Sequence, residues 1–159
     1  MAKQIYTPGP ARIKAIGIGG GGSNAVRRMA RGKLEGVDLY AINTDAVALA
    51  YTTTSEDKIT TFQIGPKVTK GMGAGGDPKV GTMAAEESRE ELRKLVRDTD
   101  MCFIAAGMGG GTGTGAAPVL AEVAKESGAL TIAIVTRPFT FEGQHRRDQA
   151  EQGIERLVP

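Results

Sequence analysis

The chain has 159 residues, 40% hydrophobic and 24% charged, which is the composition of a globular domain able to bury a core without disulfides or metal. Its 20 basic and 18 acidic residues give a net charge of +2 and no reason to expect nucleic acid as the main partner. One cysteine excludes a disulfide framework or multi-cysteine zinc site and favours a reducing compartment, and no apolar run approaches the roughly 20 residues that span a bilayer.

Short apolar runs typical of buried strands alternate with helical patterns along the whole chain. After a loose leader over residues 1–11, the expected elements of the first half are a strand over 13–18, a helix over 25–31 and strands over 37–42 and 58–64. The second half is expected to hold a helix over 78–97, a strand over 101–106, a helix over 115–127, a strand over 130–135 and a helix over 146–158.

This alternation predicts an α/β fold over residues 12–159, a Rossmann-like three-layer sandwich with a mainly parallel sheet and helices on both faces. Asp77 and Pro78 begin the longest helix, because aspartate is a good N-cap and proline suits the first helical position. Cys102 lies within a strand and is expected to be a small core residue.

Fifteen of the 23 glycines fall in three clusters, at 17–22, 71–76 and 107–115. Two of the clusters follow strands, and the other precedes the longest helix. Ligands of open parallel sheets bind beyond the carboxyl ends of the strands, and the unpaired N–H groups of a helix N-terminus attract phosphate. The glycine pattern therefore predicts a phosphate-binding site.

Helix starts near Gly22 and Gly115 are expected to point at this site, and Asn24, Thr112 and Thr114 would add polar side chains. No Gly-x-x-x-x-Gly-Lys-[Ser/Thr] run is present, so a P-loop is excluded.

The first cluster also satisfies the dinucleotide pattern G-x-G-x-x-G after a strand, which leaves a nicotinamide or flavin enzyme fragment as an alternative. Against it, the next strand ends in Asn43-Thr44-Asp45 rather than in a single acidic residue, and a dinucleotide fold does not need the cluster at 107–115.

The run Gly-Gly-Gly-Thr-Gly-Thr-Gly at 109–115 resembles the signature of the tubulin and FtsZ superfamily. Five further segments are similar to bacterial FtsZ sequences: IGGGGSNAV at 18–26, AINTDA at 41–46, KGMGAG at 70–75, FIAAGMG at 103–109 and RPFTFEG at 137–143. The resemblance covers residues 12–157.

The resemblance implies the GTP-binding domain of a tubulin-like cell-division protein, which polymerises into the septal ring and hydrolyses GTP between subunits. It implies GTP or GDP as the ligand, Mg²⁺ with GTP, like subunits and division-ring adaptors as partners, and a cytoplasmic location at the division site without direct membrane insertion. The implied nucleotide-binding residues are Gly20, Gly21, Gly22, Ser23, Asn24, Asn43, Asp45, Ala74, Gly75, Gly76, Gly107, Gly109, Gly110, Gly111, Thr112, Gly113, Glu142 and Arg146.

By the family pattern, Ala74 and Gly75 would meet the γ-phosphate, and Asn43 and Asp45 would lie near the nucleotide and its magnesium. The segment at 75–78 departs from that pattern, because it reads Gly-Gly-Asp-Pro where the family usually has Gly-Ala-Asn-Pro. Asp77 would repel a γ-phosphate unless it caps the helix or faces magnesium.

Glu142 would bind the ribose hydroxyls and Arg146 would pack against the guanosine end. The two residues are four apart and share one face if a helix begins there. Without the resemblance, a surface ion pair of little energetic value is the preferred interpretation of these two residues.

In the family this domain is followed by a strand, a long central helix that contacts guanine, and a second domain. The loop after that helix carries acidic residues that activate water for the GTP of the neighbouring subunit. Because the sequence stops at Pro159, we expect binding of GTP and GDP with poor hydrolysis, no catalytic residue in this chain, the C-terminal half as a partner, and an exposed apolar face that promotes self-association. A further alternative is a domain kept for assembly or regulation without nucleotide affinity.

Overall fold

A five-stranded, all-parallel sheet forms the centre of the computed structural model, which describes residues 9–53 and 57–158. Most of the expected leader lies outside the described residues. The strands are arranged in the order β3-β2-β1-β4-β5. Their bounds are β1 Ile13–Ile18, β2 Val37–Asn43, β3 Ile59–Gln63, β4 Met101–Gly107 and β5 Leu130–Thr136. The expected parallel α/β sheet is confirmed.

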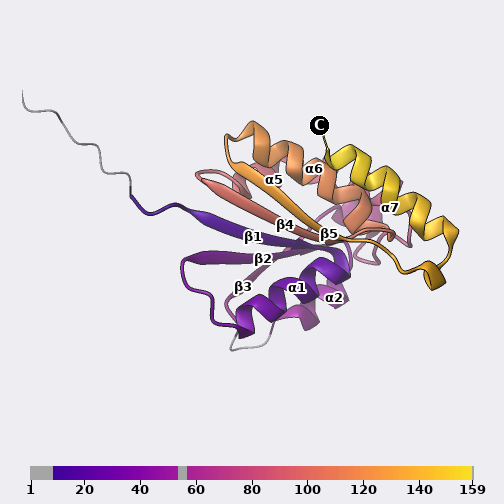
Figure 1. Ribbon diagram of the computed structural model, residues 1–159, viewed down its shortest axis with the longest axis horizontal. Helices are drawn as coiled ribbons and strands as arrows, with labels where there is room; N and C mark the ends of the chain where they lie inside the picture. The colour runs from indigo at the N-terminus through magenta and orange to yellow at the C-terminus, as the bar shows by residue number, and fades with distance from the viewer. Residues whose placement is uncertain (1–8, 54–56, 159) are drawn as a thin grey trace, which may run out of the picture.

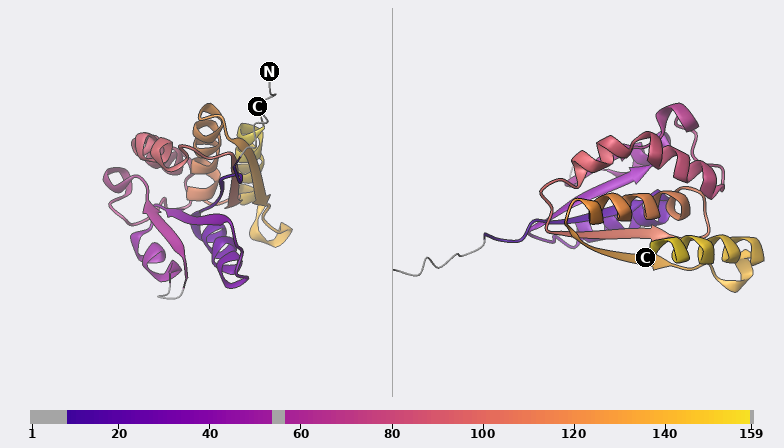
Figure 2. Two further views of the ribbon diagram at one scale, coloured as in Figure 1. Left: turned by 90° about the vertical axis from the view of Figure 1, so that its left-hand side faces the viewer. Right: turned by 90° about the horizontal axis from the view of Figure 1, so that it is seen from above.

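Helices cover both faces of the sheet, as Figures 1 and 2 show. One face carries α1 (Gly19–Arg31) and α2 (Ala46–Thr52). The opposite face carries α4 (Pro78–Glu87), α5 (Arg89–Leu95), α6 (Thr112–Glu126) and α7 (Gln144–Leu157). The short helix α3 (Pro66–Thr69) and the 3₁₀ turn η1 (Thr140–Glu142) lie in connections. The predicted three-layer arrangement is therefore confirmed.

Each face of the sheet has its own core, because successive side chains of a strand point to opposite faces. Ile16 of β1 packs with Leu120 of α6 in the larger core. Ala15, its neighbour along β1, packs with Val26 of α1 in the smaller core. Cys102 is fully buried in the larger core, as expected, and burial raises the pKa of its thiol to about 11.

Two helices begin earlier than the sequence predicts, at Gly19 rather than residue 25 and at Thr112 rather than residue 115. Residues 19–22 thus form the first turn of α1, and Gly113 and Gly115 lie in the first turn of α6, whereas 71–76 and 108–111 remain loops. Gly22 shows why this is possible, since a Cβ there would lie 2.2 Å from the carbonyl oxygen of Ala105 on β4. Close packing of backbone on backbone outweighs the weak helix propensity of glycine.

The helix expected over 78–97 is divided at Ser88, whose backbone (φ −99°, ψ 18°) leaves the helical region. The Ser88 hydroxyl oxygen accepts a hydrogen bond from the Gly65 N–H at 3.0 Å and so anchors the break to the start of α3. Helices α2 and α3 were not predicted. Within residues 9–53 and 57–158, no helix combines the length and apolar character needed to cross a membrane.

Candidate functional site

The carboxyl ends of the strands open into a hollow of about 800 Å³, which we call the glycine-lined hollow. Its walls are the start of α1, the β4–α6 loop with the first turn of α6, and the segment from β5 to α7. Nine of the predicted residues line it: Gly20, Gly21, Gly107, Gly110, Gly111, Thr112, Gly113, Glu142 and Arg146. The other nine do not: Gly22, Ser23, Asn24, Asn43, Asp45, Ala74, Gly75, Gly76 and Gly109.

Backbone N–H groups are the main polar feature of this hollow. Helices α1 and α6 begin at it, have no acidic residue in the first turn, and have no side-chain cap. The first N–H groups of a helix have no intrahelical acceptor. Within the described part of the chain, the N–H groups of Gly110 and Gly111 also donate to no protein group. The hollow therefore has the donors and the positive helix ends that bind an anion.

The loop at 73–76 lies against the β4–α6 loop. A Cβ at Gly111 would approach the Cβ of Ala74 to 2.7 Å and the backbone nitrogen of Asp77 to 2.9 Å. Ala74 is buried, whereas Gly75 is exposed. The Asp77 carboxylate caps α4, accepting the Lys79 N–H at 2.9 Å, so the expected capping role is observed.

The predicted residues at the end of β2 form hydrogen bonds that hold this edge of the sheet together. Asn43 Oδ1 accepts the N–H groups of Thr44 (2.8 Å) and Asp45 (3.3 Å). Asp45 Oδ1 accepts the Ala48 N–H at 2.9 Å and caps α2. The hydroxyls of Thr44 and Thr112 are 2.6 Å apart, which connects β2 to the first turn of α6. The predicted side chains of Asn43 and Asp45 are therefore held by local hydrogen bonds on either side of Thr44, next to the hollow.

Polar side chains near the helix starts differ in what they can offer. Ser23 is buried in α1, and its hydroxyl has no partner among the described residues. Asn24 is exposed and lies outside the lining. The expectation that Thr114 supplies a hydroxyl to the site is wrong, because this side chain is buried and its oxygen accepts the Gly109 N–H at 2.8 Å.

Glu142 and Arg146 meet at the hollow as an ion pair of 3.5 Å. They do not share one continuous helix, since Glu142 ends η1 and Arg146 lies in the first turn of α7. Glu142 Oε2 also accepts the Phe139 N–H at 2.6 Å, which fixes the carboxylate beside the hollow.

Sequence reasoning missed several lining residues at the end of β5 and in the segment that follows it. Thr136, Arg137, Pro138 and Phe139 all line the hollow. Phe139 is 69% exposed and stacks on Phe141, with ring centroids 5.3 Å apart. The segment at 137–143 was recognised as a motif, but only Glu142 was taken from it as a site residue.

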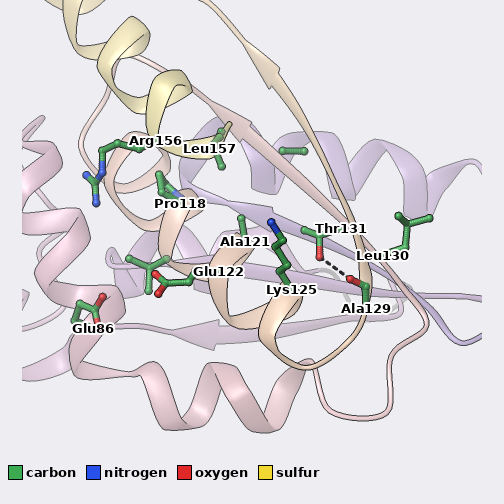
Figure 3. Close-up of a pocket in the computed structure, with 12 residues that line it drawn as sticks. Glu86, Pro118, Ala121, Glu122, Lys125, Ala129, Leu130, Thr131, Arg156 and Leu157 are labelled. Carbon is green, nitrogen blue, oxygen red and sulfur yellow. Dashed lines mark hydrogen bonds between the residues drawn. The ribbon is translucent and has the colours of Figure 1, made fainter. Parts of the chain in front are cut away.

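A second hollow, of about 650 Å³, lies beside the outer strand β5. Figure 3 shows Ala121 and Lys125 of α6 together with Thr131 of β5 and Leu157 of α7 around it. Most of its lining is aliphatic, and none of its lining residues is a glycine. It therefore lacks converging backbone donors, and the glycine-lined hollow is the stronger candidate for a functional site.

No group of three or more His, Cys, Asp or Glu side chains in residues 9–53 and 57–158 is arranged to hold a metal ion. A divalent cation at the glycine-lined hollow would consequently need ligands from a bound anion as well as from the protein.

Comparison with known proteins gives matches over nearly the whole chain. A model of the GTPase domain of the Tubulin/FtsZ family matches residues 12–159. Cell division protein FtsZ from Wigglesworthia glossinidia brevipalpis is 55% identical over 157 residues, which are 99% of this chain and 40% of that protein. The solved structure of an empty FtsZ dimer from M. jannaschii has a TM-score of 0.88 and 48% identity, and the match covers 94% of this chain and 42% of that one.

A GTPγS-bound protofilament of CetZ2 from Haloferax volcanii is similar with a TM-score of 0.79 and 26% identity, over 92% of this chain and 46% of that one. The chain therefore spans less than half the length of these relatives.

Proposed function

Because the chain belongs to the Tubulin/FtsZ family and lies within its GTPase domain, we propose that the glycine-lined hollow binds GTP or GDP. The observation that carries the proposal is the convergence of open N–H donors from α1, from α6 and from Gly110 and Gly111. These donors suit an extended chain of phosphates, whose charge the two helix N-termini would stabilise. Because the family match covers residues 12–159, it supports a guanine nucleotide as the ligand over the dinucleotide that the first glycine cluster alone would also allow.

The geometry supports a direction for the nucleotide. Its terminal phosphate would lie toward Ala74 and Gly75, because their loop packs against Gly111. Its ribose and base would lie toward Glu142 and Arg146, which line the hollow at the start of α7. Glu142 would accept hydrogen bonds from ribose hydroxyls, and Arg146 would pack against the guanosine end.

The residues present fit an Mg²⁺ ion that accompanies GTP. Such ions bind one or two carboxylates together with phosphate oxygens and water. Asp45 and Asn43 lie at the end of β2, one residue on either side of Thr44, whose hydroxyl contacts Thr112 of the hollow. When bound, Mg²⁺ would neutralise phosphate charge.

We further propose that this polypeptide binds GTP more readily than it hydrolyses it. Cleavage requires a group that orients water at the terminal phosphate. The carboxylates near the described hollow have other roles in this proposal: Glu142 would bind ribose, Asp45 would bind Mg²⁺, and Asp77 caps α4. A carboxylate from another subunit or from the remainder of the protein would have to orient the water.

Assembly into filaments of like subunits is the corresponding proposal for the whole protein, in the cytoplasm at the division site, with adaptor proteins as further partners. The exposed side chains Leu130, Ile132 and Ile134 of β5 form an apolar surface that supports contact with a further polypeptide segment or a second copy.

Calorimetric titration with GTP, GDP and NAD, combined with a phosphate-release assay, tests these proposals. We expect heat with GTP and GDP, none with NAD, and phosphate release at background. A folded protein that gives no heat with any nucleotide would favour a role in assembly alone, and binding of NAD instead of GTP would favour the dinucleotide interpretation. Hydrolysis at the rate of an intact family member would contradict the proposal on cleavage.

A further inference from the structure

Gln149, in the second turn of α7, connects the two loops that meet at the glycine-lined hollow. Its side-chain Nε2 donates to the carbonyl oxygen of Gly109 at 2.9 Å and to that of Gly76 at 3.4 Å. These partners are 40 and 73 positions away in the sequence. An amide nitrogen carries two hydrogens, so this group uses both donors to join α7 to both loops.

The bond to Gly109 orients a donor of the hollow. In a trans peptide the C=O and the following N–H point in opposite directions, and the described residues contain no cis peptide. Because the Gly109 carbonyl is turned toward Gln149, the N–H of Gly110 points away from it. Gly110 lines the hollow and its N–H has no acceptor in the described part of the chain. Gln149 thus orients an N–H group that is available to bind a phosphate, although Gln149 does not itself line the hollow.

The bond to Gly76 acts on the other loop in the same way. The Asp77 N–H of that peptide points away from Gln149 and donates to the Ala74 carbonyl at 3.1 Å, which closes the turn before α4. A single side chain therefore holds both loops in fixed orientation to each other. Direct packing of Gly111 on Ala74 is a separate contact between the same loops.

The packing of α7 does not depend on Gln149 alone. Ala150 is fully buried, and Gly153 lies so close to Thr114 that a Cβ there would be 2.6 Å from its methyl carbon. Removing the Gln149 side-chain amide should therefore loosen the two loops more than it displaces α7.

From this geometry we infer that Gln149 is a positioning residue of the phosphate-binding loops and that it favours the triphosphate over the diphosphate. The inference rests on the proposed function, in which the loop at 73–76 meets the terminal phosphate. Gln149 acts on that loop through Gly76 and on the shared phosphate donors through Gly109. Losing it should weaken GTP binding through both loops and GDP binding through one.

The test compares Gln149→Met, which keeps the length of the side chain and removes its donors, with Gln152→Met as the matched control. Gln152 is exposed on the same helix, and its side chain makes no hydrogen bond within the described residues. Calorimetry should show GTP binding weakened about 10-fold and GDP binding about 3-fold or less for Gln149→Met, the loss expected for one or two hydrogen bonds, with no change for the control.

Two measurements without nucleotide separate positioning from general stability. The Gly109 N–H donates to the Thr114 hydroxyl and the Asp77 N–H to the Ala74 carbonyl, and exchange of both amides should be faster in Gln149→Met than in Gln152→Met. Thermal unfolding of the two variants should agree. Gln149→Lys, which retains a donor at the end of a long side chain, should restore the exchange rates and the preference for GTP.

An unchanged ratio of GTP to GDP affinity in Gln149→Met would overturn the inference, whether or not the unfolding temperature falls. If the unaltered protein binds no GTP, the proposed function fails instead. The exchange rates would in that case still decide whether Gln149 holds the loops: faster exchange supports this and unchanged exchange refutes it.

Discussion

Replacing Gly22 by alanine tests whether α1 is held against β4 by direct backbone contact. The added Cβ would lie 2.2 Å from the Ala105 carbonyl oxygen, about 0.8 Å inside the 3.0 Å limit that real Cβ atoms observe. The obstacle is the backbone of a strand paired on both sides, so it cannot rotate away as a side chain could. We expect a loss of about 3 kcal/mol, at the upper end for overpacking. For a chain of this size that lowers Tm by roughly 6–12 °C.

Gly20→Ala is the matched control, since it lies in the same helical turn and a Cβ there meets nothing within 4 Å. It should leave the free energy of unfolding within about 0.5 kcal/mol, as is usual for substitutions without such contacts. Urea denaturation followed by circular dichroism measures both variants. Equal stability of Gly22→Ala and Gly20→Ala would refute the packing argument.

Three further substitutions or measurements test other features. Asp77→Asn should preserve the N-cap of α4, because asparagine caps a helix as well as aspartate does. Removing the negative charge should improve GTP binding roughly 5-fold relative to GDP in calorimetry, and equal gains for both nucleotides would place Asp77 away from the terminal phosphate. Glu142→Gln breaks an exposed ion pair with Arg146 and should cost less than about 1 kcal/mol in unfolding, yet weaken both nucleotides about 10-fold; unaltered affinity would contradict the ribose contact. Burial raises the pKa of the Cys102 thiol from 9.0 to about 11, so the thiol should resist a disulfide reagent at about pH 8 until the protein unfolds; rapid labelling of the native protein would disprove this. The stability that comes from keeping this thiol protonated should be complete below pH 9 and lost as the pH rises toward 11.

The order of strands and helices could be predicted because apolar runs and helical spacing are local properties. Strand β1 was predicted with its observed bounds, Ile13–Ile18. Helix starts within glycine clusters could not be predicted in the same way, because glycine disfavours helix and the first turn of α1 depends on close packing of Gly22 against β4 and β1. The break at Ser88 likewise depends on a hydrogen bond from Gly65, which is 23 residues away in the sequence.

Helix α2 is a miss for which the sequence held a signal. Asp45 is a good N-cap residue, and the segment that follows, Ala46–Thr52, contains three alanines and a leucine, which are good helix formers. The prediction assigned Asp45 to a nucleotide and its magnesium through the resemblance. The structure shows that its carboxylate also accepts the Ala48 N–H. A motif residue can thus have a structural partner in addition to any ligand, and only the three-dimensional structure reveals that partner.

The candidate site depends on contacts between segments that no local pattern joins. Thr44 reaches Thr112, Gly111 packs on Ala74, and Gln149 bonds to the two loops from a third element. Each contact restrains backbone whose N–H groups would otherwise have to be ordered when a ligand binds. A site with donors already fixed avoids part of that entropic cost and so gains affinity without an additional contact to the ligand. For this reason glycine can form the walls of the hollow even though it is the most flexible residue in an unfolded chain: the rigidity comes from the neighbouring side chains, and glycine contributes the close approach.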